Sequence, residues 1–191
     1  MVSRVVTRRF TVEEYHRMQE AGILNEDDRV ELLEGEILEM PPIGPAHAGS
    51  VNRLVARLLP LQAQGRALLS VQNPIRLGPD SEPQPDVALL RPRGDFYAAS
   101  HPGPEDVWLV VEVAERSADY DRLVKLPLYG RWGVLEAWVV DLGAGEVVVG
   151  RGPSAEGYRE VRVVRRGEVL SPLAFPDLVL PVDDLLGPVR S

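Results

Sequence analysis

The stretch VWLVVEVA, residues 107–114, decides the fold of this 191-residue chain. It is apolar except for one acid, which is typical of a strand buried on both faces of a sheet. Because side chains alternate between the faces of a strand, Glu112 shares a face with Val110 and Ala114, whereas Val111 faces the other way. An ionised carboxylate in a buried strand costs free energy unless it is paired or bound to a metal. Glu112 is therefore a candidate metal ligand. The alternative interpretations are that it lies at an exposed end of the strand or that it pairs with a nearby arginine.

The segments on both sides of this strand show helical and strand patterns in turn. After it, Ser117 or Asp119 can cap a helix that runs to about Arg131, and VLEAWVVD (134–141) is a second buried strand. Before it, residues 46–65 carry apolar side chains at helical spacing. Short apolar or alternating segments predict further strands at 67–72, 74–78, 85–91, 145–150, 158–164 and 168–172.

The N-terminal part predicts a helix followed by a hairpin. Thr11 and Glu14 have the spacing of a capping box, and RVELLEGEILEM (29–40) has apolar residues on both sides of a turn at Glu34-Gly35. This order of elements predicts an α/β domain of the α+β type, with a mixed sheet flanked by helices. We expect a single domain, 1–191, comprising a helix and hairpin extension at 11–40, a core at 46–141 and C-terminal antiparallel strands at 142–186.

The composition excludes several classes of protein. With no cysteine in the sequence, a disulfide framework, a thiolate zinc site and a thiol nucleophile are excluded. No apolar run approaches the roughly 20 residues that span a bilayer. The N-terminus also lacks the pattern of a signal peptide, so we expect a cytoplasmic protein that does not associate with membranes. A net charge of −8 excludes a strongly basic nucleic-acid coat protein.

Lysine and arginine are used very unequally. Of the 21 basic residues, only Lys125 is a lysine. It lies on the predicted helix after Glu112, where it can form a surface pair with Asp121 or reach the carboxylates of the sheet. Because an arginine would serve a surface pair equally well, the lone lysine favours the second interpretation.

A second acid, Asp86, follows Pro85 at the start of the predicted strand 85–91. By itself, an aspartate in this position is most often a turn residue at a strand end. With Glu112 on an adjacent strand, it forms a pair of oxygen ligands suited to Mg²⁺ or Mn²⁺.

Together these features resemble the PD-(D/E)XK, or restriction-endonuclease-like, superfamily, and within it the Uma2 family of bacterial endonucleases. The matching segments run from about Thr11 to Leu186. They are RVELLEGEILEM (29–40), the proline-rich loop into His47, EPQPDVALL (82–90), WLVVEVAERS (108–117), DRLVKLPLY (121–129) and GVLEAWVVD (133–141). The resemblance implies a restriction-endonuclease-like fold and a metal-dependent endonuclease that hydrolyses DNA phosphodiester bonds.

The resemblance also implies the roles of individual residues. Asp86 and Glu112 would bind Mg²⁺ or Mn²⁺, with the carbonyl of Val113 as a further ligand. The lysine that the superfamily usually carries two residues after the acid is replaced here by Ala114. In this family the lysine is found on the following helix, which matches Lys125, and it would position the attacking water or stabilise the phosphate.

Three further residues are candidates for the site. His47 begins the long helix, where the superfamily often places a polar group near the metal, although it can equally be a solvated or capping histidine. Glu31 faces either the site or solvent. Gln84, just before Pro85, either hydrogen-bonds a ligand as a substrate-binding residue or holds the strand. Pro127 lies within the predicted helix just after Lys125. If it breaks the helix there, Lys125 can still point inward, but Tyr129 becomes harder to place.

The charge of the chain argues against tight binding of nucleic acid. The arginines closest in sequence to the predicted site either line a cleft or form a solvated face; they are Arg91, Arg93, Arg116, Arg122 and Arg131. We therefore expect DNA as a partner bound weakly or with low specificity. The alternative function is a catalytically inactive module of the same fold, for binding or assembly. The edge offered by 145–150 and 158–164 is compatible with a homodimer or a higher homo-oligomer.

Overall fold

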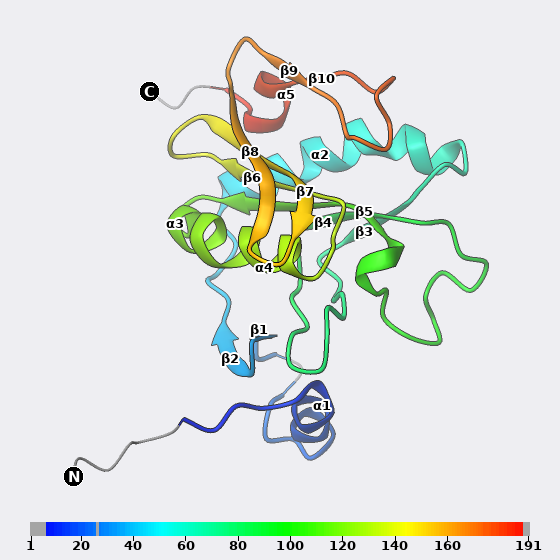
Figure 1. The fold of residues 1–191 in the computed structure, drawn as a ribbon. Helices are drawn as coiled ribbons and strands as arrows, with labels where there is room; N and C mark the ends of the chain where they lie inside the picture. The colour runs from blue at the N-terminus through cyan, green and yellow to red at the C-terminus, as the bar shows by residue number, and fades with distance from the viewer. Residues whose placement is uncertain (1–6, 26, 189–191) are drawn as a thin grey trace.

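A six-stranded mixed sheet is the centre of the structure, a computed structural model that describes residues 7–25 and 27–188. The ends of the predicted 1–191 domain and position 26 of the predicted extension lie outside the described residues. β5 and β6 pair in parallel and all other neighbours in this sheet are antiparallel. The order across the sheet is β3 (Leu68–Val71), β4 (Val87–Leu90), β5 (Val107–Ala114), β6 (Glu136–Asp141), β7 (Glu146–Ser154) and β8 (Gly157–Arg165) (Figure 1).

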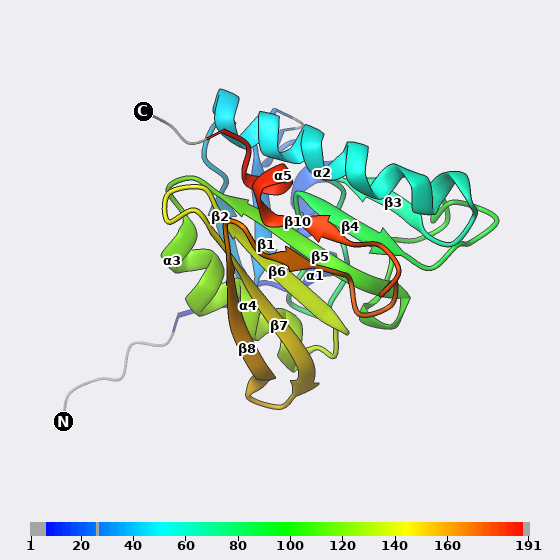
Figure 2. The same cartoon turned by 90° about the horizontal axis from the view of Figure 1, so that it is seen from above.

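Helices cover both faces of the sheet. On one face lie α2 (Pro45–Ala63) and the short α5 (Val182–Leu186). On the other lie α3 (Ala118–Tyr120) and α4 (Leu126–Arg131), as Figures 1 and 2 show from two directions. The fold is therefore the α+β arrangement that the order of elements predicts.

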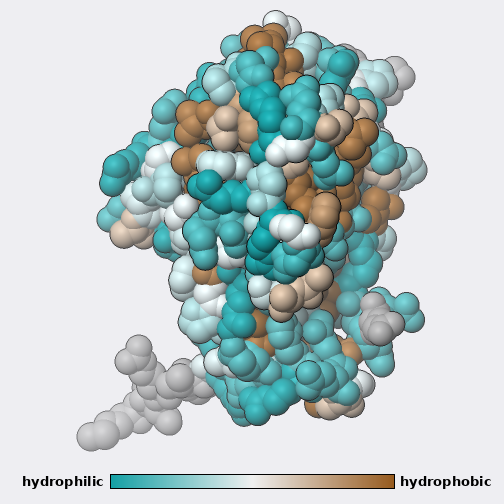
Figure 3. Space-filling view, turned by 90° about the vertical axis from the view of Figure 1, so that its right-hand side faces the viewer, coloured by the Kyte–Doolittle hydropathy of each residue, from teal (hydrophilic) through white to brown (hydrophobic). Residues whose placement is uncertain are grey.

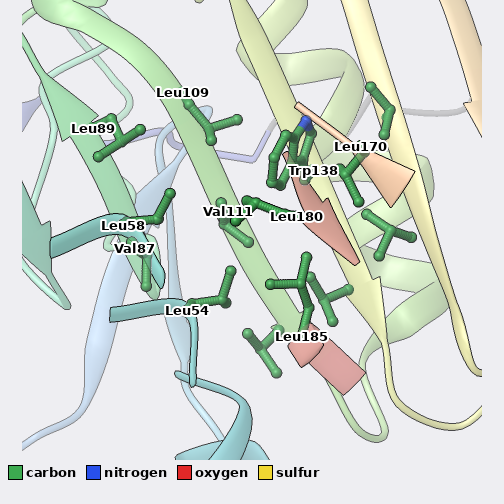
Figure 4. Packing of buried hydrophobic residues seen from close by; sticks show 14 of the residues in the cluster. Leu54, Leu58, Val87, Leu89, Leu109, Val111, Trp138, Leu170, Leu180 and Leu185 are labelled. Atoms are coloured by element: carbon green, nitrogen blue, oxygen red, sulfur yellow. The ribbon is translucent and has the colours of Figure 1, made fainter. Parts of the chain in front are cut away.

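The side chains of β5 are divided between two hydrophobic cores, in the alternation that the sequence predicts. Leu109 and Val111 pack with α2 and α5 in the core shown in Figure 4. Val110 and Ala114 pack in the other core, with α4. Because Glu112 has the parity of Val110 and Ala114, it points towards α4.

The N-terminal extension packs below the sheet in the view of Figure 1 and consists of α1 (Val12–Glu20), β1 (Val30–Leu33) and β2 (Glu36–Glu39). The capping box of α1 is present as predicted. Glu34 and Gly35 both have positive φ, 48° and 79°, which is the backbone of a type I′ hairpin turn. An isolated bridge between β1 and the core then places the hairpin beside the main sheet.

The segment 74–78 is not a strand, so that prediction was wrong. Ile75 and Leu77 are buried, as their apolar character indicates. Their N–H groups, however, donate to the carbonyls of Pro83 and Ser81. These hydrogen bonds close a loop within 75–83 and do not join the segment to a neighbouring strand. Prolines border the segment at both ends, and proline has no N–H with which to continue a sheet.

The remaining elements are the short 3₁₀ helix η1 (Pro104–Asp106) and the two-stranded pair of β9 (Val169–Leu170) and β10 (Leu180–Pro181). On the face shown in Figure 3, hydrophobic side chains gather in the upper half, whereas the lower half is largely hydrophilic. Within the described residues, no helix has the length and apolar character needed to cross a membrane.

Candidate active site

The end of β5 and the start of β4 open into a cleft of about 640 Å³. Its walls include the chain between β2 and α2, the first turn of α2, and α3. All seven candidate residues from the sequence line it: Glu31, His47, Gln84, Asp86, Glu112, Val113 and Lys125.

Glu112 lies at the bottom of this cleft and is only 4% exposed. Its Oε1 accepts a hydrogen bond from the Tyr129 hydroxyl at 2.5 Å and lies 3.3 Å from Lys125 Nζ. Burial raises the pKa of Glu112 to about 8, because it outweighs the opposite effect of Lys125, and three neighbouring acids add to the rise. Neither an exposed strand end nor an arginine partner therefore describes this residue.

Lys125 reaches the site because the helix widens immediately before α4. Residues Asp121–Lys125 form a π-helical turn, η2, in which the N–H of Leu126 donates to the carbonyl of Asp121. In a regular helix, the ring of Pro127 would clash with the carbonyl four residues earlier, and its missing N–H would leave that carbonyl unpaired. The wider turn accommodates the proline. The helix consequently continues through α4 without a break.

The Lys125 ammonium is buried between carboxylates. Its Nζ lies 2.8 Å from Glu31 Oε1 and 3.3 Å from Glu112 Oε1, and the residue is 6% exposed. Burial by itself lowers the pKa of Lys125, but the nearby carboxylates more than offset this, so the pKa is raised and the ammonium stays charged. The alternative of a surface pair with Asp121 does not apply, because Asp121 is itself buried and accepts a hydrogen bond from Ser117.

The N-terminal hairpin supplies Glu31 to the same cluster. Leu32 of β1 bridges to Glu82, which fixes the strand against the chain that precedes β4. Glu31 is 4% exposed, and its Oε2 accepts a hydrogen bond from the N–H of Gln84 at 3.1 Å. Glu31 therefore faces the cleft and not solvent.

Asp86 stands one residue before β4, and its carboxylate is held by several groups. Oδ2 accepts a hydrogen bond from the N–H of Val113 at 2.9 Å and lies 3.0 Å from His47 Nε2. Oδ1 accepts one from the Gln72 side chain at 3.2 Å. Val113 lies beyond the last paired residues of β4 and β5. Because the N–H and C=O of one residue in a strand point to the same side, the Val113 carbonyl also faces Asp86.

His47, in the first turn of α2, lines the cleft and hydrogen-bonds to Asp86. Its side chain is 15% exposed. The hydrogen bond with Asp86 raises the pKa of the imidazole, although burial acts in the opposite direction. Its second ring nitrogen, Nδ1, is buried and has no hydrogen-bond partner within the described part of the chain.

Two residues of the site were missed by the sequence analysis. Gln72 has a φ of +51°, which non-glycine residues rarely adopt. This conformation lets its carbonyl accept from the Gln84 side chain while its own side chain holds Asp86. Tyr129 was not among the candidate residues, yet its hydroxyl donates to Glu112. Its position four residues after Lys125, on the same helix face, was the signal that could have found it.

The donor set of the cleft fits a hard divalent cation. The carboxylates of Asp86 and Glu112 and the Val113 carbonyl are oxygen ligands of the kind that Mg²⁺ and Mn²⁺ prefer. Glu31 and Asp121 add negative charge that one lysine does not neutralise and a cation would offset. Within residues 7–25 and 27–188, no three histidine or acidic side chains are grouped so as to enclose a metal. The groups that would hold a cation here are thus two carboxylates and a carbonyl.

The arginines near the site in sequence do not gather around it in space. Arg116 lines the cleft. Arg122 pairs with Asp141 and Glu146 on the far side of η2. The other three lie elsewhere: Arg131 pairs with Glu34, Arg93 pairs with Asp95, and Arg91 stacks on Trp108. The cleft is thus acidic at its floor and only sparsely basic around it.

Comparison with known proteins finds a matching family and structures of similar fold. Residues 12–183 match the model of the Uma2 family, described as "Putative restriction endonuclease". The fold is similar to the crystal structure of a "putative nuclease belonging to DUF820" from Anabaena variabilis ATCC 29413. That similarity has a TM-score of 0.72 at 18% sequence identity and covers 93% of this chain and 97% of the other. No curated protein matches the chain.

Proposed function

The chain belongs to the Uma2 family, and from that premise we propose that it is a metal-dependent endonuclease that hydrolyses DNA phosphodiester bonds. The observation that carries the proposal is that Asp86, Glu112 and Lys125 line one cleft although they come from three separate segments. Two acids beside a lysine supply what this hydrolysis needs, which is ligands for a cation and a positive group for the water or the phosphate.

Asp86 and Glu112 are the proposed metal ligands, with the Val113 carbonyl as the third. A bound Mg²⁺ or Mn²⁺ would polarise a phosphoryl oxygen and lower the pKa of a bound water. The Val113 N–H and the Gln72 side chain orient the Asp86 carboxylate at the start of β4. On Glu112, Oε1 is engaged by its neighbours, which leaves Oε2 for the cation.

Lys125 is proposed to position the attacking water or to neutralise charge that develops on the phosphate. An ammonium has three N–H donors, and two of them have carboxylate partners, Glu31 and Glu112. The third donor remains for the water or for a phosphate oxygen. Glu31 is then a positioning residue, since it acts through Lys125.

His47 and Gln84 have proposed supporting roles. His47 orients Asp86 through Nε2. The amide nitrogen of Gln84 donates to the Gln72 carbonyl, so its Oε1 is the atom that can accept from a substrate.

DNA is the proposed partner, and the charge of −8 predicts that this chain alone binds it weakly. The unpaired outer edge of β8 is the proposed contact of a homodimer or higher homo-oligomer. Sedimentation that shows a monomer at every concentration would contradict the oligomer without affecting the nuclease proposal.

The test is cleavage of plasmid and branched DNA in the presence of Mn²⁺. The wild type should cut, and Lys125→Ala should not. Arg159→Ala, an exposed change on β8, is the matched control and should cut like the wild type. Circular dichroism of each variant separates loss of catalysis from loss of folding. A folded wild type that cuts no DNA would favour the inactive binding module.

A second experiment addresses the ligands separately from the chemistry. Calorimetric titration with Mn²⁺ should show binding to the wild type and to Lys125→Ala. Asp86→Ala should lose it. Binding that survives this substitution unchanged would refute the proposed ligand set.

A further inference from the structure

The cleft at the candidate active site has an apolar wall. Leu38 of β2 and Met40, Pro41, Pro42 and Ile43 of the chain that joins β2 to α2 contribute to its lining. Ile43 is 41% exposed, and Tyr120 of α3, which lines the same cleft, is 37% exposed. This chain and α3 lie at the same end of the molecule in Figures 1 and 2. Apolar and aromatic side chains left open beside an acidic floor are surfaces on which nucleotide bases can stack.

Two arginines of the cleft have no acidic partner among the residues that the structure describes. Arg29 and Arg116 both line it and both are exposed. Arg29 donates to the carbonyl of Pro41 at 3.1 Å. Neither forms an ion pair with any residue in the described ranges, in contrast to Arg122 at the other side of η2. These two guanidinium groups are therefore available for phosphates that flank the reacting one.

The depth of the floor limits what can reach it. Glu112 and Lys125 are only 4% and 6% exposed, so a phosphodiester has to enter the cleft to meet them. A DNA duplex is a stiff rod that resists the local bending this requires. An unpaired strand bends readily and exposes the faces of its bases. The affinity of a protein for duplex DNA depends on neutralising many phosphates. The two arginines of the cleft, on a chain with a net charge of −8, can neutralise few of them.

On the premise that the chain is the nuclease described above, we propose that its substrate is an unpaired DNA strand, either free or as the arm of a branched molecule. Its bases contact Tyr120 and the 38–43 wall, and its flanking phosphates contact Arg29 and Arg116. The reacting phosphate then lies over the acidic floor. The cleft recognises the single-stranded character of the strand and not its sequence, because stacking accepts every base.

The test is fluorescence anisotropy with a labelled single strand, the matching duplex and a forked duplex, in Ca²⁺ to suppress cleavage. The single strand and the fork should bind at least about tenfold more tightly than the duplex. Tyr120→Ala should weaken single-strand binding by about tenfold or more, and Tyr120→Phe should preserve it. Phe96→Ala is the matched control, since Phe96 is 73% exposed in the loop at the opposite end of β4 and β5. It should change nothing.

Salt dependence provides an independent measurement. With two phosphates neutralised, the slope of log K against log salt for a single strand should be about −1.4, and Arg116→Ala should reduce it to about −0.7. Equal affinity for duplex and single strand, absence of single-strand binding, or equal effects of Tyr120→Ala and Phe96→Ala would overturn the inference. Cleavage confined to duplex DNA in Mn²⁺ would also overturn it while sustaining the nuclease. Single-strand binding without cleavage of any DNA would instead remove the nuclease function and leave the binding site.

Discussion

Replacing Glu112 with glutamine should stabilise the metal-free protein, and the gain should grow with pH. Glutamine has the shape of the neutral acid and can still accept from Tyr129. In the folded protein, burial raises the pKa of Glu112 from 4.5 to about 8. Below pH 4.5 the carboxyl is protonated whether the chain is folded or unfolded, so wild type and Glu112→Gln should differ little.

Between pH 4.5 and 8 the folded wild type keeps a proton that the unfolded chain has released. Its free energy of unfolding therefore falls by about 1.4 kcal/mol per pH unit on account of this one group. The advantage of Glu112→Gln should be about 2 kcal/mol at pH 6 and about 5 kcal/mol above pH 8. Above pH 8 both states are ionised and the difference should become constant.

Urea unfolding from pH 4 to 9 measures this difference, with the fluorescence of Trp138, which is fully buried, as the signal. Glu160→Gln, on the exposed face of β8, is the control and should show no such trend. A gain that is the same at every pH would refute the assignment of Glu112 as a buried, neutral acid. Mn²⁺ at about 100 times its dissociation constant should stabilise the wild type by about 2.7 kcal/mol, and Glu112→Gln by less.

Four further substitutions test the packing by the same urea unfolding. Arg151→Met should cost about 3–5 kcal/mol because it leaves Glu136, which is fully buried, without its cation; a cost below 1 kcal/mol would show that this ion pair does not stabilise the fold. Tyr129→Phe removes the hydroxyl that donates to Glu112 and should lower the free energy of unfolding by about 1–3 kcal/mol. Unchanged stability would contradict that hydrogen bond. Gly130→Ala should destabilise by about 1–3 kcal/mol, since a Cβ there would clash with the backbone of Gly157 at the start of β8. Gly49→Ala, with only the end of an arginine nearby, should instead be neutral or stabilising by up to about 1 kcal/mol, and equal effects of the two glycine changes would disprove the steric argument.

Predictions from the local sequence pattern were correct where they concern a property of a single helix or strand. The alternation of VWLVVEVA predicted the face on which Glu112 lies, because side-chain parity is a property of a single strand. The same reasoning failed at 74–78. There the apolar residues are buried as expected, but the backbone bonds to residues 81 and 83 instead of to a neighbouring strand. Burial follows from side-chain character, whereas strand pairing depends on which backbone lies alongside.

The sequence by itself determined the order of the elements, the acid within a buried strand and the single lysine on the following helix. Only the tertiary structure decided that Lys125 lies between Glu31 and Glu112 instead of pairing with Asp121, and that Gln72 holds Asp86. Those contacts join β1, the end of β3, β5 and η2, which are far apart along the chain. Hydrophobic periodicity predicts structure over a few neighbouring residues. Which polar side chains come into contact depends on how whole helices and strands pack together.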